Sequence, residues 1–254
     1  MKTKNLLGAL ATLAITVTAA LAADSLPATN DDASKQNWFF DITPYLWVPT
    51  ANVETSLPST PSGVDQFATR ISAGAMLAAQ ARYRALGLFV DFDWVELNSV
   101  ALYPNPAFSE VNLRSDFFHT TVAATYQLAD GDKFHAGLLA GAVIWHVNEE
   151  LNFSPGVLPG FESSYNNTWA DPVVGGNIRY DLTRHWNLTT RDMVGGFGVG
   201  SQILVDVFGG VGYRFNKSWS TALGYRYLYE EYDRSGFKLN LDLQGAILGV
   251  SFSF

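Results

Sequence analysis

The sequence predicts an all-β protein, a transmembrane antiparallel up-and-down β-barrel of about ten strands behind a cleaved export signal. Three observations predict it: a signal peptide opens the chain, ten segments of alternating polar and apolar residues follow, and the connections between them are short and long in turn. An even number of strands joined in this way is the pattern of bacterial transmembrane barrels. Eight strands remain the alternative count.

The N-terminus carries the features of an export signal. Lys2 and Lys4 precede an apolar stretch that ends in the small-residue triplet Ala20-Leu21-Ala22. A basic start, a short apolar run and such a triplet define a secretory signal peptide, and the run is shorter than the ~20 residues of a membrane-spanning helix. We therefore expect a signal peptide at 1–22, a polar flexible leader at 23–37 and the barrel at 38–254.

Composition excludes several classes of protein. The chain has 24 acidic and 16 basic residues, a net charge of −8, which argues against a nucleic-acid partner because such proteins need a basic surface. Without cysteine, no disulfide, thiol nucleophile or thiolate metal site is possible. The four histidines lack the spacing of a metal site, and we expect no cofactor.

Ten segments have the two-residue alternation of half-buried strands. They are 38–48, 71–84, 87–97, 115–128, 133–147, 169–181, 186–198, 202–215, 219–232 and 238–254. Every second connection is a short turn, whereas 49–70, 98–114 and 148–168 are long and rich in Pro, Ser and Asn. With the N-terminus in the periplasm, the short turns are predicted to be periplasmic and the long loops extracellular.

Two hairpins predict the strand register. A two-residue turn at Ala85-Leu86 pairs Tyr83 with Leu88, and the hairpin of the eighth and ninth segments pairs Phe208 with Arg226. In both hairpins one face is apolar and the other carries the charged residues. A slip of one residue would exchange the two faces, so their separation supports the register.

The apolar face is expected to contact lipid. Aromatic residues gather on it beside the short turns, where a membrane barrel has an aromatic girdle: Tyr83, Tyr126, Phe134, Tyr180, Trp186, Tyr213, Phe215, Trp219 and Phe254. The opposite face mixes Gly, Ala and Ser with Arg and Asp, and lysine is nearly absent from the strands. A soluble barrel with its apolar face inward is the alternative, and these features favour the membrane barrel.

Two segments do not follow the simple alternation. In 186–198 a continuous strand would turn Asp192 toward lipid, so we expect a bulge near Thr190 that returns it to the interior. In 238–254 the leucines at 239, 241 and 243 have the opposite phase to the apolar residues that follow. We therefore expect only 246–254 to cross the membrane.

The polar face predicts a charged lumen that contains Arg82, Asp91, Asp93, Asn177, Arg179, Asp206, Arg214, Arg226 and Glu230. Charges in a narrow interior must be paired, because desolvation is costly. A salt-bridged plug is the favoured interpretation, and a polar pathway for water or small solutes is the alternative. Barrel size does not decide between them.

Catalytic patterns are incomplete. Asp91-Phe92-Asp93 is similar to the aspartate pair of the ten-stranded omptin proteases, but no histidine follows an aspartate by two residues to supply the second pair. His119-Thr120-Thr121 has the spacing of the His and Ser in outer-membrane lipid hydrolases, with Thr in place of Ser. We expect a non-enzymatic barrel with no catalytic residue; a surface hydrolase is the alternative.

Several motifs together resemble an uncharacterised family of Gram-negative outer-membrane β-barrels. They are Thr43-Pro44-Tyr45-Leu46-Trp47, Trp169-Ala170-Asp171-Pro172, Asp192-Met193-Val194-Gly195-Gly196-Phe197-Gly198, Gly224-Tyr225-Arg226-Tyr227 and the terminal Phe254. The resemblance implies location in the outer membrane among lipid and lipopolysaccharide, with Phe254 as a signal to the outer-membrane assembly machinery. It implies no reaction and no oligomeric state, and leaves the choice between a narrow pore and a structural, loop-presenting barrel open.

Overall fold

The computed structural model of the chain describes residues 38–56, 67–101, 107–234 and 236–254. The signal peptide predicted at 1–22 and the leader at 23–37 lie outside these residues. Within the described part of the chain, no helix is long and apolar enough to cross a membrane. The strands are β1 (Trp38–Ser56), β2 (Phe67–Tyr83), β3 (Leu86–Ala101), β4 (Phe108–Asp130), β5 (Phe134–Pro155), β6 (Phe161–Asp181), β7 (Trp186–Gly195), β8 (Ile203–Arg214), β9 (Trp219–Arg234) and β10 (Phe237–Ser253).

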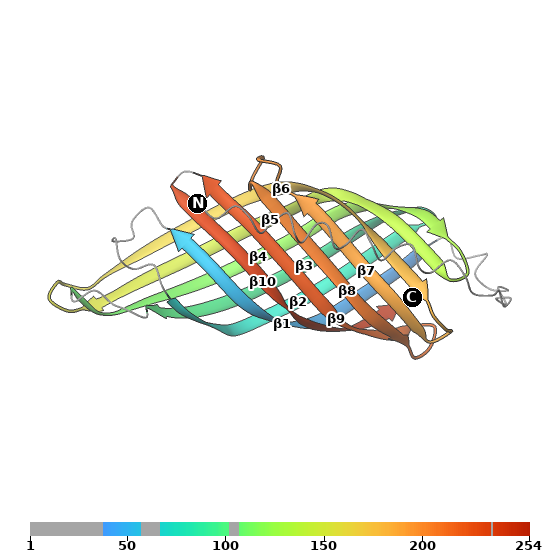
Figure 1. Cartoon of the computed structure of the whole chain (residues 1–254), viewed down its shortest axis with the longest axis horizontal. Helices are drawn as coiled ribbons and strands as arrows, with labels where there is room; N and C mark the ends of the chain where they lie inside the picture. Colours follow the sequence, from blue (N-terminus) through green and yellow to red (C-terminus); the bar gives the residue numbers. More distant parts are fainter. Residues whose placement is uncertain (1–37, 57–66, 102–106, 235) are drawn as a thin grey trace, which may run out of the picture. The chain divides into compact units, whose positions relative to one another are not determined.

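These strands form one closed antiparallel barrel in which each strand pairs with its sequence neighbours and β1 pairs with β10 (Figure 1). Both chain ends of the barrel meet at the same rim: Phe40 N donates to Phe254 O at 3.1 Å, and Phe254 N donates to Phe40 O at 3.0 Å. The prediction of ten strands is confirmed.

The strands run farther than the alternation predicted on the side away from the chain ends. Most of the expected loop 148–168 is strand, because β5 continues to Pro155 and β6 begins at Phe161. The same extension lengthens β1, β3 and β4, and in Figure 1 the yellow tip of the β5–β6 hairpin projects beyond its neighbours. The Asn and Ser residues that suggested loops lie mainly on the outer face of these extensions.

The predicted register is confirmed in one hairpin and wrong in the other. β8 and β9 pair Phe208 with Arg226. In the β2–β3 hairpin Tyr83 pairs with Leu86, two residues from the predicted partner. The turn residues there are Arg84, which has a φ of 54°, and Ala85. A shift of two leaves the side chains on the predicted faces, so the assignment of faces survives.

The outer face carries an apolar band with aromatic rims. On β4 the outward side chains from Tyr126 through Val122 to Phe118 are separated by about 26 Å of strand at ~3.3 Å per residue, or roughly 20 Å across a bilayer at a ~40° tilt. At the rim beside the chain ends, aromatic side chains form the predicted girdle, in pairs that include Trp186–Tyr213, Trp219–Phe252 and Trp38–Tyr83. This height is close to the ~25 Å of the apolar band of outer-membrane barrels.

Above the band the two faces exchange character. On β10, Leu248 and Val250 are exposed on the outside, whereas Leu239 and Leu241 are buried in the interior at 0% and 1% exposure. The pairing of β10 with β9 is continuous from Phe237 to Phe252. One uninterrupted strand thus has apolar residues outward in the band and inward beyond it, in agreement with the expectation that only 246–254 crosses the membrane.

The interior above the membrane is consequently a packed apolar core. Trp145 and Trp169 stack at 5.9 Å between ring centroids, and Trp169 lies 4.2 Å from the ring of Tyr232. Phe153 and Phe237 are also buried there, at 1% and 0% exposure. This half of the barrel has the polar-outside, apolar-inside arrangement of a water-soluble β-structure.

The bulge predicted near Thr190 is absent from the described pairing of β7. β7 pairs without a register shift with both neighbours, so Asp192 lies on the outer face opposite Gly176 and Val207. Arg191 instead faces the interior, where it stacks on Phe89 at 4.3 Å. The Gly195-Gly196 pair that suggested an irregular strand ends β7, and Gly196 has a φ of 84° in the following turn.

Candidate functional site

Arg226 of β9 is the centre of the buried charge in the barrel. Its side chain is completely inaccessible, and its guanidinium donates to both carboxylate oxygens of Asp206, from Nε at 3.0 Å and from Nη2 at 2.8 Å. Nη1 donates to Asp93 Oδ2 at 3.0 Å, and Nη2 lies 3.4 Å from Asp91 Oδ2. All three carboxylates are buried.

Three further side chains complete this group. The Tyr45 hydroxyl of β1 lies 2.8 Å from Asp91 Oδ1 and 2.5 Å from Asp93 Oδ1, and accepts from Arg226 Nη1 at 3.0 Å. His119 Nδ1 lies 3.0 Å from Asp93 Oδ2, and Arg191 Nη2 lies 3.5 Å from Asp91 Oδ2. We call the seven residues the central cluster: Tyr45, Asp91, Asp93, His119, Arg191, Asp206 and Arg226.

The central cluster joins walls that are far apart in the barrel. Arg226 is on β9 and Asp93 on β3, with β10, β1 and β2 between them along one arc and five strands along the other. Asp93 precedes Trp94, the last outward aromatic of β3 before Glu96. The cluster therefore crosses the interior at the level where the outer face changes from apolar to polar.

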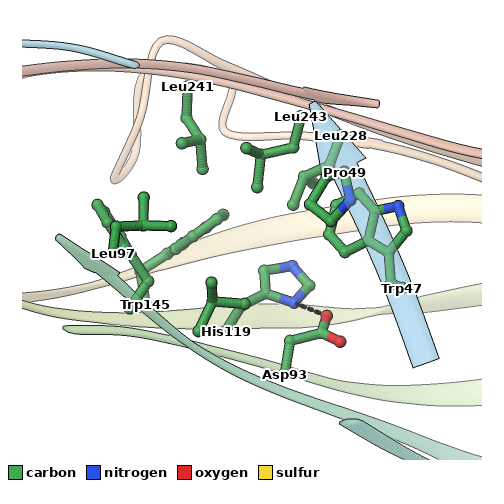
Figure 2. Close-up of a pocket in the computed structure, with 11 residues that line it drawn as sticks. Trp47, Pro49, Asp93, Leu97, His119, Trp145, Leu228, Leu241 and Leu243 are labelled. Atoms are coloured by element: carbon green, nitrogen blue, oxygen red, sulfur yellow. Dashed lines mark hydrogen bonds and ion pairs between the residues drawn. The ribbon is translucent and has the colours of Figure 1, made fainter. Parts of the chain in front are cut away.

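Apolar side chains cover the cluster on the extracellular side. Figure 2 shows the bonded Asp93–His119 pair below a pocket whose wall includes Trp47, Leu241 and Leu243. The pocket has a volume of about 20 Å³, the space of roughly one water molecule. Arg226 also stacks on Trp47 at 4.9 Å. The packed core and the charged cluster together fill this part of the interior.

Glu230 does not belong to the central cluster, contrary to the prediction. Its Oε1 accepts from Trp169 Nε1 at 3.0 Å, and the side chain is fully buried. Nearby, Asp171 accepts the Ser201 backbone N–H at 2.6 Å, which fastens the β7–β8 turn to β6. Arg226 is occupied by closer carboxylates, so Glu230 satisfies one oxygen with the indole instead.

The remaining predicted charges lie at the other end of the barrel. Arg82, Arg179, Arg214 and Asn177 line a cavity of about 580 Å³ at the rim that holds the short turns. Their ion pairs are with residues that the prediction did not include, Asp130 and Asp181. The single charged lumen expected from the sequence is thus three separate groups.

Sequence reasoning missed three members of the central cluster. Tyr45 alternates with the outward Leu46 and Val48, and this alternation is the signal that could have placed it inside. A bulge near Thr190 that returned Asp192 to the interior would turn Arg191 outward, and Arg191 was not among the predicted lumenal residues. His119 was expected to be a core or lumenal histidine, and it lies buried inside the barrel, but no pattern in the sequence indicated its contact with Asp93.

The geometry of the aspartate pair differs from an open hydrolytic site. Asp91 and Asp93 are buried at 0% and 3% exposure, and the residues that face them from β8 and β9 are Asp206 and Arg226. Thr121, two residues from His119, is also fully buried. The carboxylates are ion-paired inside the barrel rather than arranged around a solvent-filled cleft.

No protein-family model matches the chain, and no curated protein matches it. Among solved structures, the outer-membrane protease OmpT from Escherichia coli is similar with a TM-score of 0.52 and 10% identity, over 92% of this chain and 100% of that one. The attachment invasion locus protein Ail of Yersinia pestis gives 0.35 and 11% over 86% and 99%, and Neisserial surface protein A gives 0.34 and 17% over 86% and 98%.

At ten per cent identity the similarity to OmpT shows a shared fold. Together with the apolar outer band and its aromatic girdle, it makes this chain an outer-membrane β-barrel in a lipid environment. Membership of the uncharacterised barrel family stays a prediction from the motifs.

Proposed function

We propose that the protein is a non-enzymatic outer-membrane barrel with a closed lumen. The extracellular ends of β4, β5 and β6 form a wall of β-strands that the barrel presents to the exterior. The observation that carries the proposal is Arg226, whose guanidinium is inaccessible and ion-paired to carboxylates from β3 and β8. A solute-conducting lumen would leave a continuous wet path past this side chain. Removing paired charges from water in this way is expensive and fixes the walls to one another.

The extracellular extension supports the second half of the proposal. β4, β5 and β6 have 23, 22 and 21 residues, about twice the ~9–11 that cross a bilayer. Polar side chains cover the outer face of the extension, including Arg114 and Glu150, which pair in register. A stiff, packed projection of this kind offers a fixed surface to a partner outside the cell.

The aspartate pair supports a non-enzymatic role. A general base must reach the proton that it abstracts, within hydrogen-bond distance or through one water. Asp91 and Asp93 are held by Arg226, Tyr45 and His119 inside the barrel. The expected result is therefore no hydrolysis of peptide or phospholipid substrates by the folded protein.

Single-channel recording tests the closed lumen. Purified, refolded protein in planar bilayers should give no unitary conductance above the bare membrane at neutral pH. Discrete, reproducible openings of the wild-type protein would contradict the proposal and support a narrow pore. The heat-modifiable gel mobility of the same sample must show that the protein is folded and inserted, so that an absence of conductance reflects a closed barrel.

A further inference from the structure

We infer that the cavity inside the periplasmic rim is a binding site for a small anionic molecule that carries carboxylate or phosphate groups. The cavity lies at the end of the barrel that holds the short turns, the start of β1 and the end of β10. In an outer-membrane barrel this is the periplasmic end. Its volume of about 580 Å³ is in the ~300–1,000 Å³ range of small-molecule sites. The inference does not depend on whether the lumen beyond it conducts.

Cationic side chains dominate the charge of the cavity wall. The lining includes Arg82, Arg179, Arg214 and Lys217 from four different parts of the barrel, against the carboxylates of Asp41 and Asp130. Asp41 is engaged locally, because its oxygens accept from Thr43 Oγ1 at 2.8 Å and Ser253 Oγ at 2.7 Å. Counting also Asp181, which pairs with Arg179 and Arg214, four cationic side chains meet three carboxylates, so the site has a small surplus of positive charge.

Two of the arginines share one aspartate. Arg179 and Arg214 both approach Asp181, with Nε 3.2 Å from Oδ1 and Nη2 3.7 Å from Oδ2 respectively. Arg179 Nε and Asp181 Oδ1 are both buried and, among the described residues, neither has a hydrogen bond with correct geometry. Across the cavity Arg82 lies 3.6 Å from Asp130, whose other oxygen is 2.6 Å from His135.

This arrangement suits an incoming oxyanion. Guanidinium groups have fixed forked donors that match carboxylate and phosphate oxygens, and charge-assisted hydrogen bonds are the strong ones. Arg179 and Arg214 would bind the anionic groups, and the amides of Asn177 and Asn187, which also line the cavity, would donate to further oxygens. The cavity lies at the rim with the short turns, so the site is reached from the periplasm.

Calorimetric titration of the refolded protein in detergent micelles, at low ionic strength and pH 7, tests the site. The probes are citrate for carboxylates and inorganic pyrophosphate for phosphates, with glycerol as an uncharged control. Saturable binding of either anion, near one per barrel, is expected, and whichever of the two binds identifies the ligand chemistry. Binding of neither anion, or equal heats with glycerol, would overturn the inference.

Substitutions locate the binding. The double change Arg179→Gln and Arg214→Gln should weaken the affinity by about tenfold or more, because two charge-assisted donors are lost. Arg184→Gln is the matched control, since Arg184 lies in the neighbouring 182–185 turn and does not line the cavity. Equal weakening in the control, or full affinity in the double variant, would show that the anion binds elsewhere. Should the double variant not refold, Arg214→Lys keeps the charge but removes the fork and should weaken binding partially.

Discussion

Arg226 holds both oxygens of Asp206, 20 residues away in the chain, through hydrogen bonds of 3.0 and 2.8 Å, and neither side chain is accessible to water. In the β8–β9 register Asp206 is opposite Leu228, so the contact is diagonal and uses the full length of the arginine. The same guanidinium reaches Asp93 on the far wall. One side chain thereby links neighbouring strands and opposite walls.

The first prediction is that Arg226→Leu destabilises the folded barrel by several kcal/mol, about 3–5, because buried carboxylates lose their partner. Urea unfolding in lipid vesicles measures the free energy of unfolding. Arg114→Leu is the control: Arg114 also pairs with a carboxylate, Glu96 at 2.8 Å, but at an exposed site worth ~0–1 kcal/mol. A normally stable Arg226→Leu barrel that opens to ions would show a gate instead of a closed lumen.

The second prediction tests the lipid-facing band. Val122 lies four residues from both outward aromatics of β4, Phe118 and Tyr126, near the middle of the band. Val122→Arg should destabilise the barrel by ~2–4 kcal/mol and reduce insertion, as cations do at the midplane. Val157→Arg, at the fully exposed tip of the β5–β6 hairpin, should change neither. If both variants insert equally well, this outer face does not contact hydrocarbon.

The third prediction concerns Asp192, which faces outward between Val207 and Gly176. A carboxylate on the lipid face is unfavourable, although less so than the ~2–4 kcal/mol of an arginine. Asp192→Val should therefore stabilise the barrel, by roughly 1 kcal/mol, in the same unfolding assay. Destabilisation would mean that a polar contact of Asp192, with Thr190 of the same strand or with another protein chain, outweighs its cost in lipid, and Asp192→Asn would then retain most of the stability.

The fourth prediction addresses the terminal aromatic. Phe254 is exposed in the girdle, where its ring lies 5.4 Å from Phe40 and 5.6 Å from Phe252. Deleting it or changing it to Asp should sharply lower the folded yield in cells. Phe215→Asp removes another exposed girdle aromatic that is not at the terminus. An equal loss in both variants would mean that Phe254 acts only as part of the girdle, and refolding in vitro separates stability from recognition by the assembly machinery.

The fold was accessible from the sequence because two-residue alternation decides which face a residue occupies. In β8 and β9 the polar face with Arg226 excluded a register shifted by one residue, because that shift would place the polar face in lipid. The β2–β3 register was less constrained: a shift of two residues keeps every face, and only the φ of 54° at Arg84 fixes the turn. Sequence alternation cannot detect a shift of an even number of residues.

The candidate site could be predicted only in part from the sequence. Alternation indicates which face of the barrel wall a side chain occupies, but not its height along the barrel axis. Asp91, Asp206, Arg214 and Glu230 were all placed inside correctly, yet they belong to three groups at different levels of the barrel. The reversed phase of the leucines in β10 looked like an irregular strand for the same reason. Its cause is the membrane surface, which changes the solvent on the outside while the backbone continues unchanged.

The polar side chains on the outer face of the extracellular wall make insertion of the barrel into the membrane more difficult. A strand that enters from the periplasm must move Arg114, Glu150 and their neighbours through hydrocarbon before they reach water on the far side. Each such charge costs a few kcal/mol at the bilayer midplane, so spontaneous insertion into an intact bilayer meets a barrier that grows with the length of the wall. The longer the extracellular projection, the more its assembly depends on a locally thinned or catalysed path across the membrane.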